Sequence, residues 1–182
     1  AGRGCADVVY ITISTGIGGG AYMGGRLLEG CDGNAGEIGH FTVETRYDLC
    51  CGCGGVGHWE AYASGRNIPS FYRAWLSREG RPSGESSPKR CESVFSAARS
   101  GDADALRFLD VLGTINGRGI SAVIAAYNPS VIVLDGPVVR QNAEFILPQM
   151  ERSINTHLRR PAIAISPLEG EAPLIGASLI GG

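Results

Sequence analysis

The stretch DVVYITISTGIGGG (residues 7–20) decides the fold, because a run of β-branched and aromatic residues ends at a cluster of glycines. Residues 7–15 predict a strand that is buried on both faces. Next, AYMGG and RLLEG (residues 21–30) predict two short strands joined at Gly24 and Gly25, a pattern typical of a hairpin. HFTVE (residues 40–44) predicts a further strand. The first quarter of the chain is therefore expected to form a meander of strands.

The remainder of the chain alternates helical and strand patterns. The predicted helices cover residues 59–65 with Gly65 as C-cap, 68–80, 102–127 with Asp102 as N-cap, 137–157 and 172–182, and the predicted strands cover residues 130–136 and 161–168. Gly113, Gly117 and Gly119 interrupt the longest helix, so close backbone packing is expected there. Residues 80–89, rich in Pro, Gly and Ser, are expected to form a surface loop. This order of elements predicts an α/β fold with a mixed sheet.

Composition narrows the class of protein. A chain of 182 residues that is 43% hydrophobic favours one compact domain. The formal net charge of -2 argues against a nucleic-acid partner, because proteins that bind the phosphate backbone cluster Lys and Arg. The sequence has no uninterrupted apolar run of the roughly 18 to 20 residues that span a bilayer, and its start lacks a signal-peptide pattern. We therefore expect a cytoplasmic protein with no membrane segment.

The segment CCGCGGVGHWE (residues 50–60) indicates a metal site. Cys51, Cys53 and His58 offer two thiolates and an imidazole within eight residues, and the glycines between them let the chain curl around one point, which suits tetrahedral zinc. His40 is the natural fourth ligand, with Cys50 as its competitor. Four protein ligands leave no position for water, so the site would be structural. Reduced thiols near a turn are the alternative.

The other cysteines, Cys5, Cys31 and Cys91, stand alone and are expected to be small buried hydrophobes.

Two carboxylates lie beside the expected ligands. Glu37 precedes His40 by three residues in GNAGEIGH (residues 33–40), and Glu60 follows His58 by two. Ligation of His40 would hold Glu37 in place for a substrate hydroxyl, and the same metal would fix Glu60. Solvent-facing helix carboxylates are the alternative interpretation. The glycines of TGIGGG (residues 15–20) favour either a hairpin turn or backbone amides that bind phosphate.

Taken together, five motifs resemble the ROK family of sugar kinases and related repressors. They are VVYITISTGIGGG (residues 8–20), GNAGEIGH (33–40), CGCGGVGHWEAYASG (51–65), NPSVIVLDG (128–136) and APLIGA (172–177). Their order and spacing extend over nearly the whole chain. The resemblance implies the C-terminal lobe of an actin-like, ribonuclease H-like ATPase, with a mixed sheet, flanking helices and a zinc loop.

The resemblance also implies roles for individual residues. Thr15, Gly16, Gly18 and Gly19 would contact nucleotide phosphates, with Gly136 near the adenosine. Glu37, His40, Glu60 and Asn34 would bind sugar hydroxyls, and His40 would also ligate zinc with Cys51, Cys53 and His58. The family usually has a third cysteine where this chain has His58, an exchange that zinc accepts. The family's glycine triplet near the adenosine is matched here at Gly136 alone.

The function implied is that of a glucokinase-like, ATP-dependent hexose kinase that also uses Mg²⁺. Residues 1–182 would be its single C-terminal lobe. The catalytic Asp and the first phosphate loop would belong to an N-terminal lobe that precedes this sequence, so the chain alone would be inactive. Family members also commonly form homodimers. Two alternatives stay open: the sugar-sensing lobe of a repressor, and a zinc-stabilised interaction domain that binds no sugar.

Overall fold

A five-stranded mixed sheet forms the centre of the protein, described here by a computed structural model that covers residues 1–81, 87–168 and 170–172. The strands are β1 (Val8–Ile13), β2 (Ile17–Met23), β3 (Arg26–Leu27), β4 (Val131–Asp135) and β5 (Ala162–Ile165). They lie in the order β3-β2-β1-β4-β5. The β1–β2 and β2–β3 pairs are antiparallel, whereas β1–β4 and β4–β5 are parallel. The predicted α/β class and mixed sheet are confirmed.

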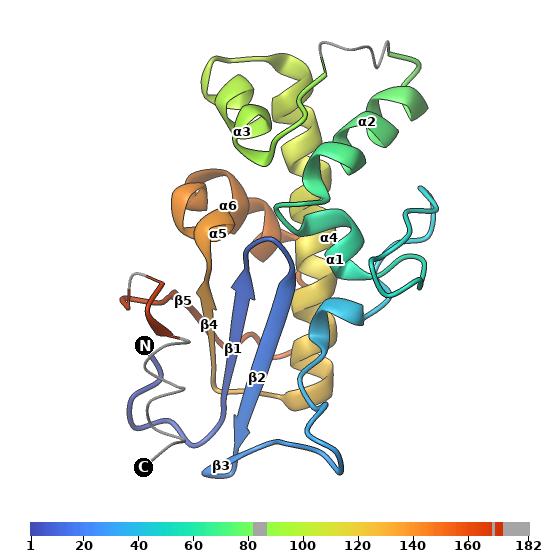
Figure 1. The fold of residues 1–182 in the computed structure, drawn as a ribbon. Helices are drawn as coiled ribbons and strands as arrows, with labels where there is room; N and C mark the ends of the chain where they lie inside the picture. Colours follow the sequence, from blue (N-terminus) through green and yellow to red (C-terminus); the bar gives the residue numbers. More distant parts are fainter. Residues whose placement is uncertain (82–86, 169, 173–182) are drawn as a thin grey trace.

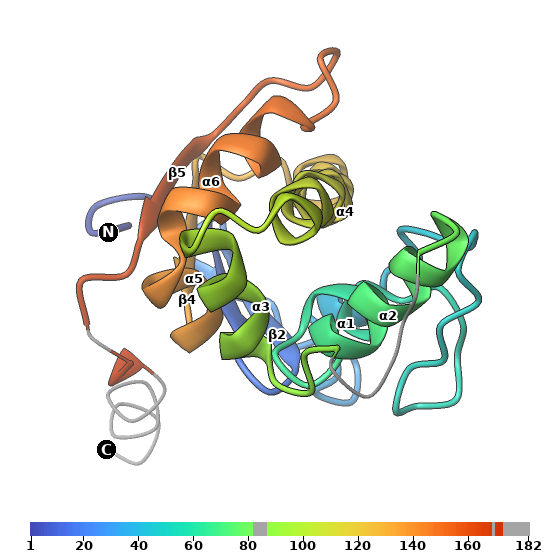
Figure 2. The ribbon, with the colours of Figure 1, turned by 90° about the horizontal axis from the view of Figure 1, so that it is seen from above.

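The helices cover one face of the sheet and extend beyond its end (Figures 1 and 2). They are the 3-10 helix η1 (Ile38–His40), then α1 (Trp59–Ala63), α2 (Ile68–Arg78), α3 (Cys91–Arg99), α4 (Ala103–Tyr127), α5 (Pro137–Gln141) and α6 (Ala143–Arg152). Helices α4 and α6 lie side by side, while α2 and α3 stand past the β1–β2 turn. The turn is therefore surrounded by α1, α3 and α5, and this arrangement creates the site.

Helix α4 forms the spine of the core. Asp102 is its N-cap, as predicted, and the Asp102 carboxylate accepts a hydrogen bond from the backbone amide of Ala105 at 2.8 Å. The expected close packing is confirmed: a Cβ on Gly113, Gly117 or Gly119 would lie 2.2–2.4 Å from a neighbouring side chain. Helix α4 is long and apolar enough to cross a membrane, but 67% of its apolar 18-residue stretch is buried inside the fold. That burial is typical of the core helix of a globular protein.

Two predicted elements differ in the structure. Residues 41–44 form no strand; after η1, a single bridge joins Thr42 to His58. The chain bends there because Glu44 turns inward to two arginines. The helix expected over residues 137–157 is divided into two helices, α5 and α6. The break lies at Asn142, because its side-chain amide donates a hydrogen bond to the Val138 carbonyl at 2.8 Å in place of a backbone amide.

Other expectations are corrected in smaller ways. Cys91 is buried as expected, but Cys5 and Cys31 are exposed. Helix α1 ends at Ala63 with Ser64 as its C-cap, one residue before the predicted cap at Gly65. Helix α3 was not predicted, although Cys91, Val94, Phe95 and Ala98 are buried at helical spacing. All but the first residue of the expected terminal helix (172–182) and part of the expected loop (80–89) lie outside the described residues.

Candidate functional site

Four side chains from three segments converge on one point beside α1, and this group of possible metal ligands is called the metal cluster below. His40 ends η1, Cys51 and Cys53 belong to the loop that follows, and His58 is the N-cap residue of α1. One ligand atom from each residue lies within 4.8 Å of all the others. Cys51 is buried, the two histidines are half-buried and Cys53 is exposed. The structure thus brings together all four residues that the sequence predicted as metal ligands.

The distances within this cluster match the edges of a metal-centred tetrahedron. Nδ1 of His40 lies 3.3 Å from Nδ1 of His58 and 3.7 Å from Sγ of Cys51, and Sγ of Cys53 lies 3.3 Å from Nδ1 of His58. Zinc bonds of the usual lengths give edges of about 3.3 Å between two nitrogens and about 3.5 Å between nitrogen and sulfur. The donor set and its spacing therefore fit a tetrahedral zinc ion. Burial raises the pKa of the Cys51 thiol, so a bound ion would have to displace its proton.

Cys50 does not belong to this cluster. Its backbone pairs with Val56 across the loop, and its side chain is exposed. Cys50 instead lines a neighbouring cavity with Cys51, Glu60 and Arg66. Among the described residues, the four-residue group is complete without it.

Glycines shape the loop that presents the ligands. Gly54 and Gly57 have φ of +90° and +82°, in the left-handed region that disfavours other residues. A Cβ on Gly55 would lie 2.3 Å from the ring of His58. These glycines let the chain reverse tightly enough for Cys53 and His58 to meet.

An ionic cluster around the buried Glu44 carboxylate fastens the loop to α4. The Glu44 carboxylate accepts hydrogen bonds from Arg46 at 2.6 Å and from Arg118 at 2.8 Å, and Arg118 also donates to the Val43 carbonyl. Burial alone would raise the pKa of Glu44, but the hydrogen bonds from Arg46 and Arg118 outweigh it and lower the pKa to about 2. The far end of the loop lies against its base, because the amide of Val43 donates a hydrogen bond to the Gly57 carbonyl.

Glu37 lies beside His40 of the metal cluster, whereas Asn34 belongs to the exposed loop that precedes η1. The Glu37 carboxylate, 65% exposed, lies 3.4 Å from Nε2 of His40, the ring nitrogen that faces away from the cluster. This contact orients the imidazole and directs Nδ1 toward the metal position. Asn34 is exposed in the preceding loop, where its amide donates to Asp32. Both side chains are accessible to a polar ligand.

Glu60, in the first turn of α1, contacts two parts of the site. Its Oε1 lies 3.6 Å from Sγ of Cys51, and its Oε2 accepts the backbone amide of Ile17 at 2.9 Å. The side chain therefore lies between the metal cluster and the β1–β2 turn. It is not the solvent-facing carboxylate of the alternative interpretation.

The β1–β2 turn, at Ser14–Gly16, offers backbone donors. None of the described residues accepts a hydrogen bond from the amide of Thr15 or Gly16. Adjacent free amides in a tight turn are typical of anion-binding sites. The turn joins β1 to β2 in an antiparallel hairpin, as one of the two interpretations of TGIGGG predicted. Gly18 and Gly19 lie in β2 instead, where a Cβ on Gly19 would collide with Ile38.

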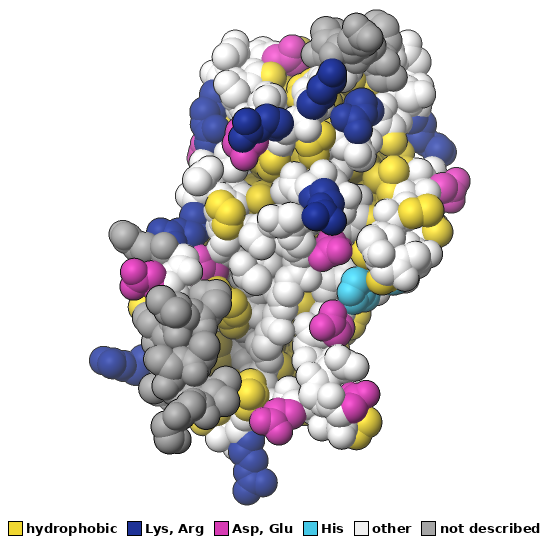
Figure 3. Space-filling model, in the orientation of Figure 1, with side chains coloured by type: hydrophobic (Ala, Val, Ile, Leu, Met, Phe, Trp, Pro, Cys, Tyr) yellow, Lys and Arg dark blue, Asp and Glu magenta, His cyan; other side chains and the backbone are white. Residues whose placement is uncertain are grey.

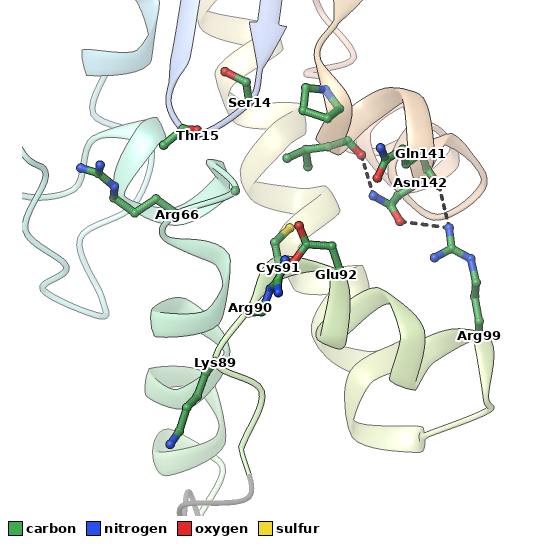
Figure 4. A pocket seen from close by; sticks show the side chains of 13 residues that line it. Ser14, Thr15, Arg66, Lys89, Arg90, Cys91, Glu92, Arg99, Gln141 and Asn142 are labelled. Atoms are coloured by element: carbon green, nitrogen blue, oxygen red, sulfur yellow. Dashed lines mark hydrogen bonds and ion pairs between the residues drawn. The ribbon is translucent and has the colours of Figure 1, made fainter.

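A cavity of about 400 Å³ opens beside this turn (Figure 4). Ser14 and Thr15 form one side, Gln141 and Asn142 the opposite side, and Arg90, Cys91 and Glu92 at the start of α3 close the end. Arg99 braces this wall from α3, donating to Asn142 at 3.0 Å and to the Gln141 carbonyl at 2.7 Å. Basic side chains gather on the upper part of the face seen in Figure 3, over α2 and α3. The cavity is thus suited to a ligand with negative charge.

Gly136 occupies the end of β4, away from the metal cluster. It has φ +93°, and a Cβ there would lie 2.3 Å from the Ile13 carbonyl oxygen, so only glycine lets β4 leave the sheet at this point. Its amide donates to the buried Asp135 carboxylate at 2.7 Å, which also accepts the Tyr10 hydroxyl at 3.1 Å. Burial and the Asp135 charge raise the pKa of Tyr10 to about 12. Gly136 lines a separate cavity with Pro137, Arg140 and Gln141.

Sequence reasoning missed most of the cavity wall. Arg66, Lys89, Arg90, Gln141 and Asn142 were not singled out. The helical spacing of the buried residues in α3 could have placed Arg90 at a helix start. The other wall residues follow no motif, because their position depends on how α3 and α5 pack against the turn.

The sheet order, the glycine turn after β1 and the ligand cluster beside it define a lobe of the actin-like ATPase fold. The family model described as ROK family matches residues 1–180. The chain therefore belongs to the ROK family.

Similar proteins with known names are sugar kinases and a regulator. A glucokinase from Aeropyrum pernix is 41% identical over 159 residues, which are 83% of this chain and 50% of the relative. A Streptomyces griseus ROK glucokinase, solved with glucose and AMPPNP, has a TM-score of 0.79 and 33% identity over 99% of this chain and 62% of that one. A ROK-family transcriptional regulator, a homologue of the Escherichia coli MLC protein, has a TM-score of 0.69 and 29% identity over 90% of this chain and 42% of that one. This chain spans about half the length of the curated relatives it matches.

Proposed function

We propose that this chain is the C-terminal lobe of an ATP-dependent, glucokinase-like hexose kinase in the cytoplasm. One observation supports this most: Glu60 lies between a four-ligand metal cluster and a turn with two free amides. A sugar site and a phosphate site must adjoin for phosphoryl transfer, because the reaction depends mainly on placement of the two substrates. The names of the similar proteins agree with this chemistry.

In this proposal the hexose binds on the open side of the metal cluster. Glu37, His40, Glu60 and Asn34 accept from and donate to its hydroxyls. Zinc, held by His40, Cys51, Cys53 and His58, would supply a structural cross-link that fixes the bend of the loop. The ion is not a reactant, since four protein ligands leave no position open for substrate.

The nucleotide is proposed to lie in the cavity beside the β1–β2 turn. The free amides of Thr15 and Gly16 would bind phosphate oxygens, and the wall formed by α3 and α5 would enclose the nucleoside. Gly19 would keep β2 close to Ile38 of η1, with Gly18 beside it in the strand. Gly136 would lie near the adenosine, in the neighbouring cavity that it lines. Mg²⁺ would accompany ATP and neutralise charge as the γ-phosphoryl group leaves.

The reaction itself needs a group from outside this chain. The sugar hydroxyl oxygen would attack the γ-phosphorus, the bond to the β,γ-bridging oxygen would break, and the hydroxyl proton would pass to an Asp of the preceding lobe. Residues 1–182 alone are therefore expected to be inactive, and the complete protein is proposed to be a homodimer.

A coupled assay of ATP-dependent glucose phosphorylation tests this function. The expected result is activity when the upstream sequence is restored and none from the 182-residue chain. Glu37→Gln in the restored protein should raise KM for glucose at least tenfold, because a hydrogen bond between a charged group and the sugar is lost. Glucose phosphorylation by the 182-residue chain alone would contradict the proposed division of labour.

A regulatory role is the second candidate, because the regulator noted above shares this fold over 90% of the chain. The sugar-binding residues would then serve as a sensor without phosphoryl transfer. The same assay decides between the two candidates, because a restored protein with the regulatory role would bind glucose but phosphorylate none.

A further inference from the structure

The segment from His58 to Asn67 touches both the metal cluster and the phosphate-facing turn. At its start, His58 is one of the four cluster residues. At its end, the amide of Gly65 donates to the Ser14 carbonyl at 2.7 Å and the amide of Arg66 donates to the Thr15 carbonyl at 3.3 Å. Between them lies α1, only five residues long. A shift of the cluster end of this segment therefore reaches the turn within a few residues.

Glu60 provides the direct connection. Its Oε2 accepts the Ile17 amide at 2.9 Å while its Oε1 faces Sγ of Cys51 at 3.6 Å. The helix start that bears Glu60 is held from the other side, where the Asn67 side chain donates to the Glu60 carbonyl at 3.0 Å. The carboxylate is thus a bridge between one cluster residue and one residue of the turn.

The residues around the Glu60 bridge are closely packed. A Cβ on Gly16 would lie 2.5 Å from Oε2 of Glu60, and a Cβ on Gly65 would lie 2.9 Å from the Ser14 carbonyl oxygen. Both glycines allow the turn and α1 to approach more closely than other residues would. Close-packed contacts of this kind pass on a displacement instead of absorbing it.

We infer that Glu60 is a positioning residue that makes the conformation of the β1–β2 turn depend on whether the metal site is filled. When the ion fixes His58 and Cys51, the start of α1 is fixed, and Glu60 holds the Ile17 amide. When the ion is removed, the start of α1 is released and the Ile17 hydrogen bond opens more often. The metal thereby orders the phosphate-facing turn without contacting it.

Amide hydrogen exchange of the 182-residue chain, followed by NMR, tests this inference. The Ile17 amide should exchange about tenfold faster after zinc is removed with a chelator, as expected for the loss of a hydrogen bond to a charged acceptor. Amides of β5, which forms the far edge of the sheet beyond β4, should change much less. An unchanged Ile17 rate with a measurable loss of zinc would overturn the inference.

Variants at position 60 separate this role from general stability. Glu60→Ala should still bind one zinc, because Glu60 is not a ligand, yet its Ile17 amide should exchange rapidly with or without zinc. Glu60→Gln keeps an acceptor oxygen and should restore part of the zinc-dependent protection. The matched control is Glu37→Ala, which removes another carboxylate beside a cluster residue but has no bond to the turn. At saturating zinc this control should keep the protection at Ile17.

The inference rests on the metal site of the proposed function but not on its kinase activity. If no zinc binds, both the metal site and the coupling are wrong. If zinc binds and protects Ile17, the coupling holds even for a protein that phosphorylates no sugar. If the Glu60→Ala variant keeps the full zinc-dependent protection of Ile17, the bridge through Glu60 is wrong and the metal site stands.

Discussion

The Arg118 guanidinium on α4 lies 2.8 Å from the Glu44 carboxylate at the base of the metal loop. Because Glu44 is buried and its pKa is lowered from 4.5 to about 2, its ionised form stabilises the folded state. This stabilisation is complete above the unfolded pKa and disappears as pH falls from about 5 toward 2. We expect it to amount to about 3 kcal/mol of unfolding free energy.

Urea unfolding at several pH values measures this dependence. The native chain should lose stability steeply between pH 5 and pH 2, while Glu44→Gln should be less stable at pH 7 and lose less over the same range. Glu92→Gln is the matched control, because the pair that Glu92 forms with Arg90 is exposed. Equal slopes for the native chain and Glu44→Gln would contradict the assigned role of Glu44.

Zinc content should depend on the four cluster residues and not on the neighbouring thiol. We expect one zinc per chain in the native protein, and less than a fifth of that in Cys51→Ala and His58→Ala after dialysis, because three ligands bind the ion much more weakly than four. Metal analysis of the purified variants gives the values. Cys50→Ala is the control and should keep the full content, and its loss of zinc would place Cys50 in the site.

Nucleotide binding should be sensitive to the shape of the turn. In Gly16→Ala the new Cβ would meet the Glu60 carboxylate at 2.5 Å, so the turn must shift and its free amides with it. We expect the Kd for magnesium AMPPNP, measured by calorimetry, to rise at least tenfold. Gly20→Ala lies on the same hairpin with no atom within 4 Å of its Cβ and should bind like the native chain. Equal affinity in both variants would remove the turn from the nucleotide site.

The sequence was sufficient where local chemistry decides structure. The strand before the glycine turn, the Asp102 cap of α4 and the spacing of Cys51, Cys53 and His58 all follow from residue type and interval. His40 was also predictable as the fourth member of the cluster, since a tetrahedral site needs a fourth donor close to the loop.

The remainder depends on contacts between distant segments. HFTVE has the composition of a strand, but burial of Glu44 against Arg118, 74 residues away, bends it into the loop. Asn142 breaks a helical pattern through its own amide and through Arg99. The composition of a segment does not predict which distant residue it will contact. The cavity wall and the hydrogen bond between Glu60 and Ile17 could therefore be found only in the three-dimensional structure.

The most direct test of the account is an NMR titration of the zinc-loaded chain with glucose and with magnesium AMPPNP. The account predicts that glucose shifts the amide signals around Glu37, His40 and Glu60, that AMPPNP shifts those of Thr15 and Gly16, and that the two sets meet at Ile17. Signals that stay unchanged with both ligands at millimolar concentration, in a folded chain with one zinc, would contradict it.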